Sequence, residues 1–474
     1  MKGPAVRVVV VGGGIAGLAA AHRLADAARE GRADVEPVLL EARDHLGGTI
    51  RTERAGGFLL EAGPDSFISD KPWALALAER IGLGPRLRGT DERHRRTYVV
   101  RAGRLRPLPD GFLLLAPTRL WPIVASPVFS WRGKLRMALD LVLPRGAPDD
   151  DESLASFVTR RFGREALERV AAPLVAGIYT ADPARLSLAA TMPRFLALER
   201  EHRSLILALR RRAAPREVAG ASGARWSLFV TLADGMQELV DALAARLPAG
   251  SVRLGCPAVA LAPEARGWRV RVGDGSAFRA DGAILAGEAP RMAGLVREVD
   301  PDLARLLAGI PYASSVTVTL AYPRAAIRHP LDGFGFVVPR EEERAALACT
   351  FSSVKYQGRA PEGFALLRVF LGGALGAEVL ERDDAALVRL AQDDLAGLLG
   401  IEGAPVLTRV RRHPAAMPQY EVGHLDRVAA IEARLRELPG LAVAGAAYRG
   451  VGIPDCVRSG EEAADRVLAA AIRP

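Results

Sequence analysis

The sequence predicts an α/β protein with a discontinuous Rossmann-like domain, an inserted helical domain and a further domain built on a mixed β-sheet. Three observations support this fold class. The chain opens with a β-branched run, a glycine-rich turn and an alanine-rich helix. Patterns that would complete such a unit return only in the second half of the chain, and a long helical stretch without a nucleotide-binding signature separates the two parts.

The first element carries a dinucleotide-binding fingerprint. Gly12, Gly14 and Gly17 follow the β-branched run 6–11 in the spacing G-x-G-x-x-G. The first glycine permits a tight turn, the second lets a pyrophosphate approach the backbone, and the third lets helix and strand pack closely. A second apolar run, "VEPVLLEA", places Glu41 about 20 residues further on, where a carboxylate accepts a ribose hydroxyl. The residues expected to contact the nucleotide are Gly12, Gly14, Ile15, Ala16, Gly17, Glu41 and Ala42.

A second glycine-rich region identifies the dinucleotide. A nicotinamide dehydrogenase has no need for further glycine-rich loops directly after the ribose-binding carboxylate. A flavin bound in extended form needs backbone along its pyrophosphate and again beside its ring. The sequence therefore predicts that the cofactor is FAD. The loop residues expected to bind it are Gly47, Gly48, Thr49, Gly63, Pro64, Asp65 and Ser66.

Composition limits the remaining classes. A chain of 474 residues with 49 % hydrophobic residues is long enough for two or three domains. Cys256, Cys349 and Cys456 are isolated, which predicts small buried side chains in a cytoplasmic protein. The seven histidines show no metal-ligand spacing, and no signal peptide precedes Val6, so we expect neither a metal site nor export.

The net charge of +9 raises the question of a nucleic-acid partner. The arginines are spread along helices beside acidic residues, without interleaved aromatics, so we expect no nucleic acid. An anionic membrane surface or a carboxylate-bearing substrate accounts for the excess better. The apolar segment 111–129 is interrupted by Arg119 and three prolines and cannot span a bilayer. It is either a set of short helices that dips into one leaflet, with the protein peripheral on the cytoplasmic membrane face, or a buried wall.

The order of the patterns predicts five segments. Residues 86–222 hold a strand pair that contributes to a substrate slot, followed by the helical insertion. Residues 299–412 are rich in strands and suit a sheet that forms one wall of a cavity. We expect the C-terminal helix to point its N-terminus at the flavin ring, where the helix dipole favours negative charge. The FAD-binding domain is assembled from the other three segments: 1–85, 223–298 and 413–474.

The combination of Glu41 with the loop "GPDSF" resembles the superfamily of flavin-dependent amine oxidases and protoporphyrinogen oxidases. Further motifs, spread from Val6 to the C-terminal helix, resemble the bacterial protoporphyrinogen oxidase family within it: "IYTADPARLSLAATMPRF", "DGFGFVVP", "SSVKYQGRAPEG", "MPQYEVGHLDRV" and "AGAAYRGVGIPDCVRSGEEAA". Pro454 departs from members with asparagine there and puts one backbone hydrogen bond near the flavin in doubt. The resemblance implies further FAD contacts at Val259, Ala446, Val451, Gly452 and Ile453.

The resemblance also implies the chemistry and the substrate contacts. A porphyrinogen bridge carbon would lose hydride to the flavin, which oxygen or another acceptor reoxidises, so no catalytic side chain is expected. Arg96 matches the arginine that binds a substrate propionate, and Arg95 is the competing choice for this role. The alternative is that neither arginine binds substrate and that this run is an edge strand exposed to solvent. The residues expected to line the slot are Gly177, Phe334, Phe336 and Thr350; Phe334 would stack on a pyrrole, although single aromatics also serve as plain core.

The sequence leaves three functions open. The first is oxidation of a porphyrinogen, the second is oxidation of an amine or desaturation of another substrate, and the third is a flavin-binding role in association with other heme-pathway components. A homodimer is also left open. Among porphyrinogens, the slot segments favour protoporphyrinogen IX, oxidised to protoporphyrin IX. Their cations cluster around Arg93–Arg96 only, and an apolar wall disfavours unpaired carboxylates. The alternative is oxidation of coproporphyrinogen III to coproporphyrin III, which needs cations on more sides of the slot or an opening to water.

Overall fold

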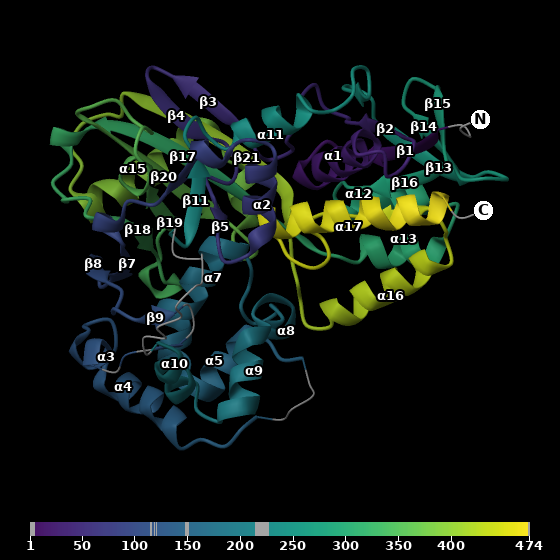
Figure 1. Ribbon diagram of the computed structural model, residues 1–474. Helices are drawn as coiled ribbons and strands as arrows, with labels where there is room; N and C mark the ends of the chain where they lie inside the picture. Colours follow the sequence, from purple (N-terminus) through teal and green to yellow (C-terminus); the bar gives the residue numbers. More distant parts are fainter. Residues whose placement is uncertain are drawn as a thin grey trace.

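The structure, a computed structural model, describes residues 5–113, 116, 117, 119, 121–146, 151–213 and 227–472. Figure 1 shows two β-sheets with their covering helices, and a group of helices beneath the second sheet. The α/β class, with a parallel Rossmann-like sheet and a separate mixed sheet, is confirmed.

The first sheet is parallel and has its N-terminal strand at the centre. Val8–Val11 of that strand are buried, because helices or smaller strands cover both faces of the sheet. Strands from three distant parts of the chain build the sheet, so the nucleotide-binding fold is discontinuous, as the sequence predicts. In spatial order they are β12 (Val252–Arg253), β2 (Val35–Leu40), β1 (Val6–Val11), β16 (Gly282–Leu285) and β22 (Leu441–Val443).

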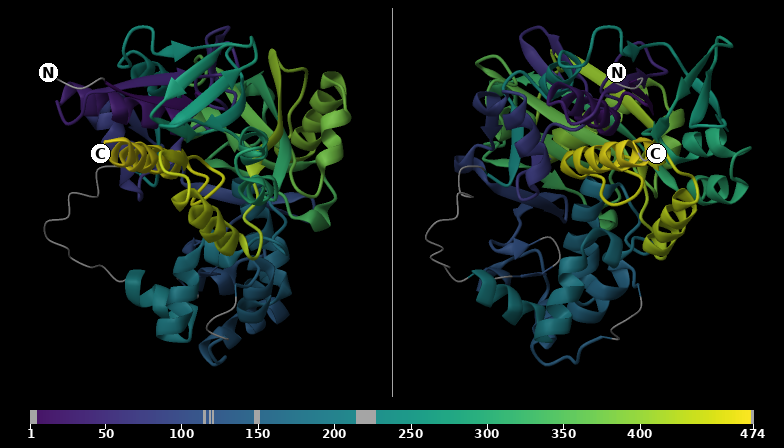
Figure 2. Two further views of the ribbon diagram at one scale, coloured as in Figure 1. Left: turned by 90° about the vertical axis from the view of Figure 1, so that its right-hand side faces the viewer. Right: turned by 45° about the vertical axis from the view of Figure 1, so that its right-hand side comes forward.

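Two long helices from opposite ends of the chain pack against each other on one face of this sheet. A side chain at Gly460 of α17 would collide with the carbonyl oxygen of Ala16 of α1, at 2.1 Å, so glycine permits this close crossing. Figure 2 shows α17 running across this part of the molecule toward the second sheet. The helices on this face are α1 (Ile15–Arg29), α2 (Pro72–Arg80), α11 (Gln237–Ala244) and α17 (Ile453–Ala471). The opposite face carries β13 (Ala258–Pro263), β14 (Trp268–Val272), β15 (Ala277–Ala280), α12 (Ala289–Val296), α13 (Pro301–Ala308) and α16 (His424–Arg436).

The second sheet is mixed, because β18 runs parallel to β7 while the other neighbours are antiparallel. The helix α15 (Asp384–Leu399) covers one face, and α7 (Ala172–Tyr179) lies against the other. In order its strands are β21 (Leu407–Pro418), β17 (Tyr312–Pro323), β20 (Phe364–Gly372), β19 (Ala346–Phe351), β18 (Gly333–Val337), β7 (Arg96–Arg101) and β8 (Arg104–Pro107).

Short strands connect these bodies. The hairpin β3 (Thr52–Ala55) and β4 (Phe58–Glu61) packs against the second sheet through Phe58 and Leu60. A three-stranded sheet joins β5 (Phe67–Ile68), β11 (Phe229–Leu232) and β6 (Leu87–Gly89), and a two-stranded ladder joins β9 (Phe112–Leu113) and β10 (Ala116–Pro117).

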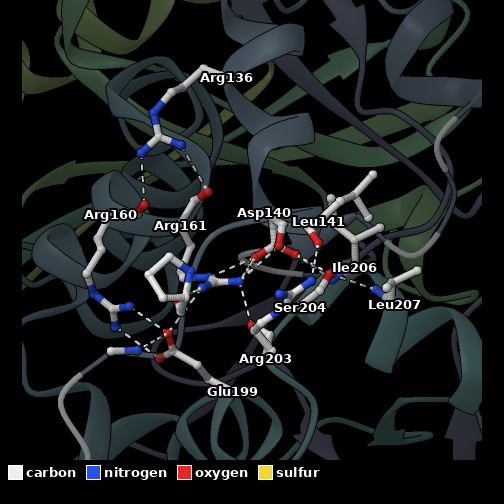
Figure 3. Close-up of polar contacts among 12 residues, drawn as sticks. Arg136, Asp140, Leu141, Arg160, Arg161, Glu199, Arg203, Ser204, Ile206 and Leu207 are labelled. Carbon is white, nitrogen blue, oxygen red and sulfur yellow. Dashed lines mark hydrogen bonds and ion pairs between the residues drawn. The ribbon is translucent and has the colours of Figure 1, made fainter.

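A buried ion pair holds the helical insertion together. Arg161 on α5 and Asp140 on the short helix η3 (Leu139–Leu141) are both fully buried, and their side chains form an ion pair. The second carboxylate oxygen of Asp140 accepts hydrogen bonds from the Ser204 hydroxyl at 2.7 Å and from the Ile206 N–H at 3.0 Å (Figure 3). The pair therefore joins η3, α5 and the start of α10.

The helices of the insertion are α3 (Trp121–Ala125), α4 (Trp131–Ala138), α5 (Leu154–Phe162), α6 (Arg164–Ala166), α7, α8 (Leu188–Thr191), α9 (Pro193–His202) and α10 (Leu205–Ala213).

The apolar segment 111–129 combines buried and exposed side chains. Ile123, Val128 and Phe129 belong to the core of the insertion, whereas Trp121 is 77 % exposed. Leu114, Leu115, Thr118 and Leu120 lie outside the described residues. Within the described ranges, no helix is both long enough and apolar enough to cross a bilayer.

Candidate active site

Three glycine-containing loops meet at the carboxyl end of the first sheet. The Gly47 N–H donates to the Gly13 carbonyl at 2.8 Å, and a Cβ on Gly48 would touch the Gly14 Cα. A Cβ on Gly63 would lie 1.9 Å from the Thr49 carbonyl oxygen, so the third loop lies directly on the second. The structure thus brings together the predicted cofactor residues in the ranges 12–17, 47–49 and 63–66.

Glu41 lies where the sequence places the ribose-binding carboxylate, directly after β2. One of its oxygens accepts the Gly13 N–H at 2.6 Å and the other accepts the Arg43 N–H at 2.8 Å. Each carboxylate oxygen retains a lone pair for a hydroxyl ligand. Gly13, which the sequence analysis did not single out, therefore orients Glu41, and the intervening Ala42 belongs to the same turn.

The backbone at Gly14 has the open space that a pyrophosphate needs. A Cβ built on Gly14 would meet no atom within 4 Å, whereas a Cβ on Gly17 would lie 1.9 Å from the Gly12 carbonyl oxygen. The two glycines thus have the separate roles that the fingerprint assigns: access at Gly14 and close helix–strand packing at Gly17. The N-terminus of α1 begins at Ile15 and Ala16, beside this space. The residues present fit a dinucleotide.

The C-terminal cofactor residues are tied to the same region. The hydroxyl of Tyr420 donates to the Ala446 carbonyl at 2.6 Å and accepts the Gly450 N–H at 2.7 Å, which fixes the turn that carries Val451. The helix α17 begins at Ile453 with Gly452 as its N-cap and without a side-chain cap. Pro454 has no N–H, so at this end of α17 the backbone N–H groups of Ile453 and Asp455 are the ones that can face a ligand.

Val259 lies on β13, at the far end of the nucleotide region. Its side chain is 46 % exposed. The strand is held near Glu41 because the Cys256 N–H donates to the Glu41 carbonyl at 2.8 Å. This position suits the adenine end of a dinucleotide, while Val451–Ile453 lie toward the second sheet.

On the substrate side, α7 faces β19. A Cβ on Gly177 would lie 3.9 Å from the Cβ of Ala348. Thr350 follows two residues after Ala348 and therefore shares its face of the sheet. The structure brings Gly177 and Thr350 to one side of the sheet, the side that carries α7.

The two phenylalanines of β18 are placed differently from each other. Phe336 is 2 % exposed and packs edge to face on Phe351, in the core covered by α15. The structure therefore does not bring Phe336 together with Gly177. Phe334 is half-buried at the point where the register of β18 shifts between Gly333 and Gly335. This irregularity breaks the alternation on which a sequence-based assignment of faces depends.

Arg96 begins β7 and is bound to an acidic neighbour. Its guanidinium donates to the Asp332 carboxylate at 2.7 Å, and the Tyr98 hydroxyl binds the other oxygen of Asp332. The hydrogen bond from Tyr98, followed by the charge of Arg96, lowers the pKa of Asp332. Arg96 thus lies with Tyr98, at the α15 side of the strand, with its side chain 64 % exposed. Arg95 pairs with Glu92 on the surface.

A buried group of charges beside the Gly63–Ser66 loop was missed in the sequence. Lys355 lies 3.2 Å from Asp65, and Arg359 lies 3.6 Å from Glu61. Burial opposes ionisation of Asp65, but the charges of Lys355 and Arg368 and a hydrogen bond from Ser66 outweigh it and lower the pKa to about 2. Arg368 comes here through the pairing of β20 with β17 and β19, and no local motif predicts that pairing.

Comparison with known proteins identifies the family. Residues 15–468 match the family model described as flavin containing amine oxidoreductase. Coproporphyrinogen III oxidase of Propionibacterium freudenreichii subsp. freudenreichii is 39 % identical, over 98 % of this chain and 91 % of that protein. Coproporphyrinogen III oxidase of Bacillus subtilis is 34 % identical over 97 % of both chains. Protoporphyrinogen oxidase of Bos taurus is 34 % identical over 97 % of this chain and 98 % of that protein.

A solved structure agrees with this result. The crystal structure of a putative protoporphyrinogen oxidase from Exiguobacterium sp. 255-15 has a TM-score of 0.86 and 30 % identity, and covers 99 % of this chain and 100 % of that chain. The predicted cofactor, FAD, is the one that the family implies. From the match over nearly its whole length, the chain belongs to the family of flavin containing amine oxidoreductases.

Proposed function

We propose that the protein oxidises coproporphyrinogen III to coproporphyrin III in heme biosynthesis, using FAD and dioxygen. The observation that carries this proposal is the similarity to coproporphyrinogen III oxidases along almost the whole chain, at 39 % and 34 % identity. The sequence alone favoured protoporphyrinogen. The similarity to the bovine protoporphyrinogen oxidase keeps that substrate as the second candidate.

The exposure of two side chains supports a substrate with four carboxylates. The argument against such a substrate assumed that the propionates would be buried against an apolar wall. Two side chains near the expected slot are open to water: Ile178, next to Gly177, is 44 % exposed, and the Arg96 side chain is 64 % exposed, whereas Phe336 is buried. A propionate at such a rim keeps its hydration, so the desolvation cost does not arise.

The chain's own residues supply the binding surface rather than acid or base groups. Gly177 and Thr350 offer a weakly polar wall on the α7 side of the sheet. Arg96 lies on the α15 side at the start of β7, so a propionate would have to extend past the end of this strand to reach its guanidinium. FAD, when bound, accepts two electrons from a bridge carbon in each round. Three rounds remove six hydrogen atoms from the porphyrinogen, and three molecules of dioxygen leave as hydrogen peroxide.

The test is turnover by the purified yellow protein in air. We expect coproporphyrinogen III to give fluorescent coproporphyrin, with three molecules of oxygen consumed for each porphyrin formed. Protein stripped of FAD is the control and should give no product above the spontaneous rate. Bound flavin without turnover of any porphyrinogen would contradict the proposal and favour a role in association. Turnover of amines in place of porphyrinogens would favour an amine oxidase.

A further inference from the structure

A small cavity lies behind the loop that carries Gly63–Ser66. Its volume is about 10 Å³, the space of about one water molecule. It lies between the hairpin strand β4, the second sheet and the segment that follows β19. The ionisable side chains that line it are Glu61, Asp65, Tyr356, Arg359 and Arg368.

The charges around this cavity do not balance. Lys355 is paired with Asp65 and Arg359 with Glu61. Arg368, which is only 6 % exposed, forms no ion pair within 4 Å in the part of the chain that the structure describes, although the charges of Asp65 and Glu61 act on it from further away. Lys355, Arg359 and Arg368 carry three positive charges against the two carboxylates of Asp65 and Glu61, an excess of one, and burial lowers the pKa of Arg368. Burying a guanidinium without an ion pair costs free energy. A negatively charged group that binds later would offset this cost.

The guanidinium of Arg368 is only partly satisfied by its neighbours. Its Nη2 donates to the Ala62 carbonyl at 3.2 Å, and its Cζ lies 5.0 Å from the centre of the Phe370 ring. Its Nε is buried and has no hydrogen-bond partner. Nε and Nη1 of Arg359, beside the same cavity, also have no hydrogen-bond partner among the described residues, and one water molecule in the cavity can bind donors of this kind.

The position of Arg368 links the cofactor loop to the slot. Ala62 immediately precedes the loop Gly63–Ser66, which is expected to lie beside the flavin. Across the sheet, Arg368 pairs in register with Thr350 of β19, so both side chains are on one face. Arg368 therefore lies between the two regions at which electrons would leave the substrate and enter the cofactor.

We propose that Arg368 stabilises the negative charge that FAD acquires when it is reduced. Loss of hydride from a porphyrinogen bridge carbon, with a pyrrole proton released to water, converts neutral oxidised flavin into the reduced anion. Dioxygen then takes two electrons and, with two protons, leaves as hydrogen peroxide. A fixed cation favours the anion in the first step, and a low-dielectric site strengthens the interaction. The inference rests on the FAD cofactor and not on which porphyrinogen is oxidised.

Sulfite titration of the oxidised holoenzyme measures this charge without any porphyrinogen. Sulfite adds to oxidised flavin and leaves it anionic, so its affinity reports a nearby cation. We expect Arg368→Met to weaken sulfite binding by at least roughly tenfold and to lower the flavin reduction potential. Arg368→Lys should restore most of both. The matched control is Arg409→Met, because Arg409 occupies the same row of the sheet but is paired with Glu53.

The outcomes separate this role from two others. Unchanged sulfite affinity and potential in Arg368→Met with a full complement of FAD would overturn the proposal and leave Arg368 a structural role. A raised KM for the porphyrinogen with unchanged sulfite affinity would overturn it too, and would assign Arg368 to a substrate carboxylate. If Arg368→Met loses FAD, Arg368→Gln provides the same test, because its amide can still bind the Ala62 carbonyl without a charge.

Discussion

Arg96 donates a hydrogen bond to Asp332 at 2.7 Å, where β7 and β18 lie side by side next to the edge strand β8 of the second sheet. Because Arg96 is mostly exposed, water screens this ion pair and it contributes little to stability. A substrate propionate can therefore compete with Asp332 for the guanidinium.

This relationship leads to the first prediction. Arg96→Ala should raise KM for the porphyrinogen severalfold, corresponding to about 1 kcal/mol, with little change in kcat, because the contact is remote from the reacting carbon. Steady-state kinetics will check it. Arg95→Ala, which breaks only the surface pair with Glu92, is the control. An effect in Arg95→Ala alone would move the anchor to that residue.

The second prediction concerns the pyrophosphate. Gly14→Val places a side chain in space that is empty of protein atoms, so it should exclude FAD without a clash inside the apoprotein. The variant should purify colourless, with the Tm of wild-type protein from which FAD has been removed. Gly294→Val is the matched control, because a Cβ there also meets no atom and lies on α12, away from the loops. Yellow Gly14→Val with full FAD would show that the pyrophosphate lies elsewhere.

The third prediction concerns the helical insertion. Asp140→Ala removes the nearer carboxylate of the fully buried Arg161 and leaves Glu199, at 3.4 Å, as its remaining acidic partner, so it should lower the free energy of unfolding by about 3 kcal/mol. Chemical denaturation will measure the change. Glu168→Ala removes an exposed ion pair with Arg164 and should leave the free energy of unfolding nearly unchanged. Equal losses in the two variants would contradict the role of the buried pair.

The fourth prediction concerns the exposed apolar side chains of the insertion. Trp121, Trp131 and Leu135 are each at least 67 % exposed, and Lys134 lies over the Trp131 ring while it donates to the Val124 carbonyl, which ties α4 to α3. Aromatic and basic side chains together suit an anionic bilayer surface. The protein should therefore co-sediment with anionic vesicles, and serine at all three positions should weaken this binding at least roughly tenfold.

The control for this binding is Val406→Ser, which removes an exposed apolar residue elsewhere. Equal binding by the triple variant and the wild type would show that these side chains belong to another interface or to none.

The sequence predicts the cofactor site better than the substrate site, for a physical reason. Gly12–Gly17 and Glu41 act through local backbone geometry, which a short motif encodes. The face of the sheet on which Phe336 lies relative to Phe334 depends on a register shift between Gly333 and Gly335. No alternation of apolar and polar residues in the sequence reveals this shift. Arg368 reaches the cofactor loop through the pairing of β20 with β17 and β19, a contact between distant segments. Such contacts determine charge near the flavin, and a linear pattern does not contain them.

The ratio of kcat/KM for coproporphyrinogen III to kcat/KM for protoporphyrinogen IX, measured on one preparation of the holoenzyme, tests the central claim most directly. Each assay follows the fluorescence of its own porphyrin, so FAD content and protein quality cancel in the ratio. We predict a clear preference for coproporphyrinogen III, by roughly tenfold or more, equivalent to about 1.4 kcal/mol of transition-state binding. An equal or higher value for protoporphyrinogen IX would contradict the proposed function.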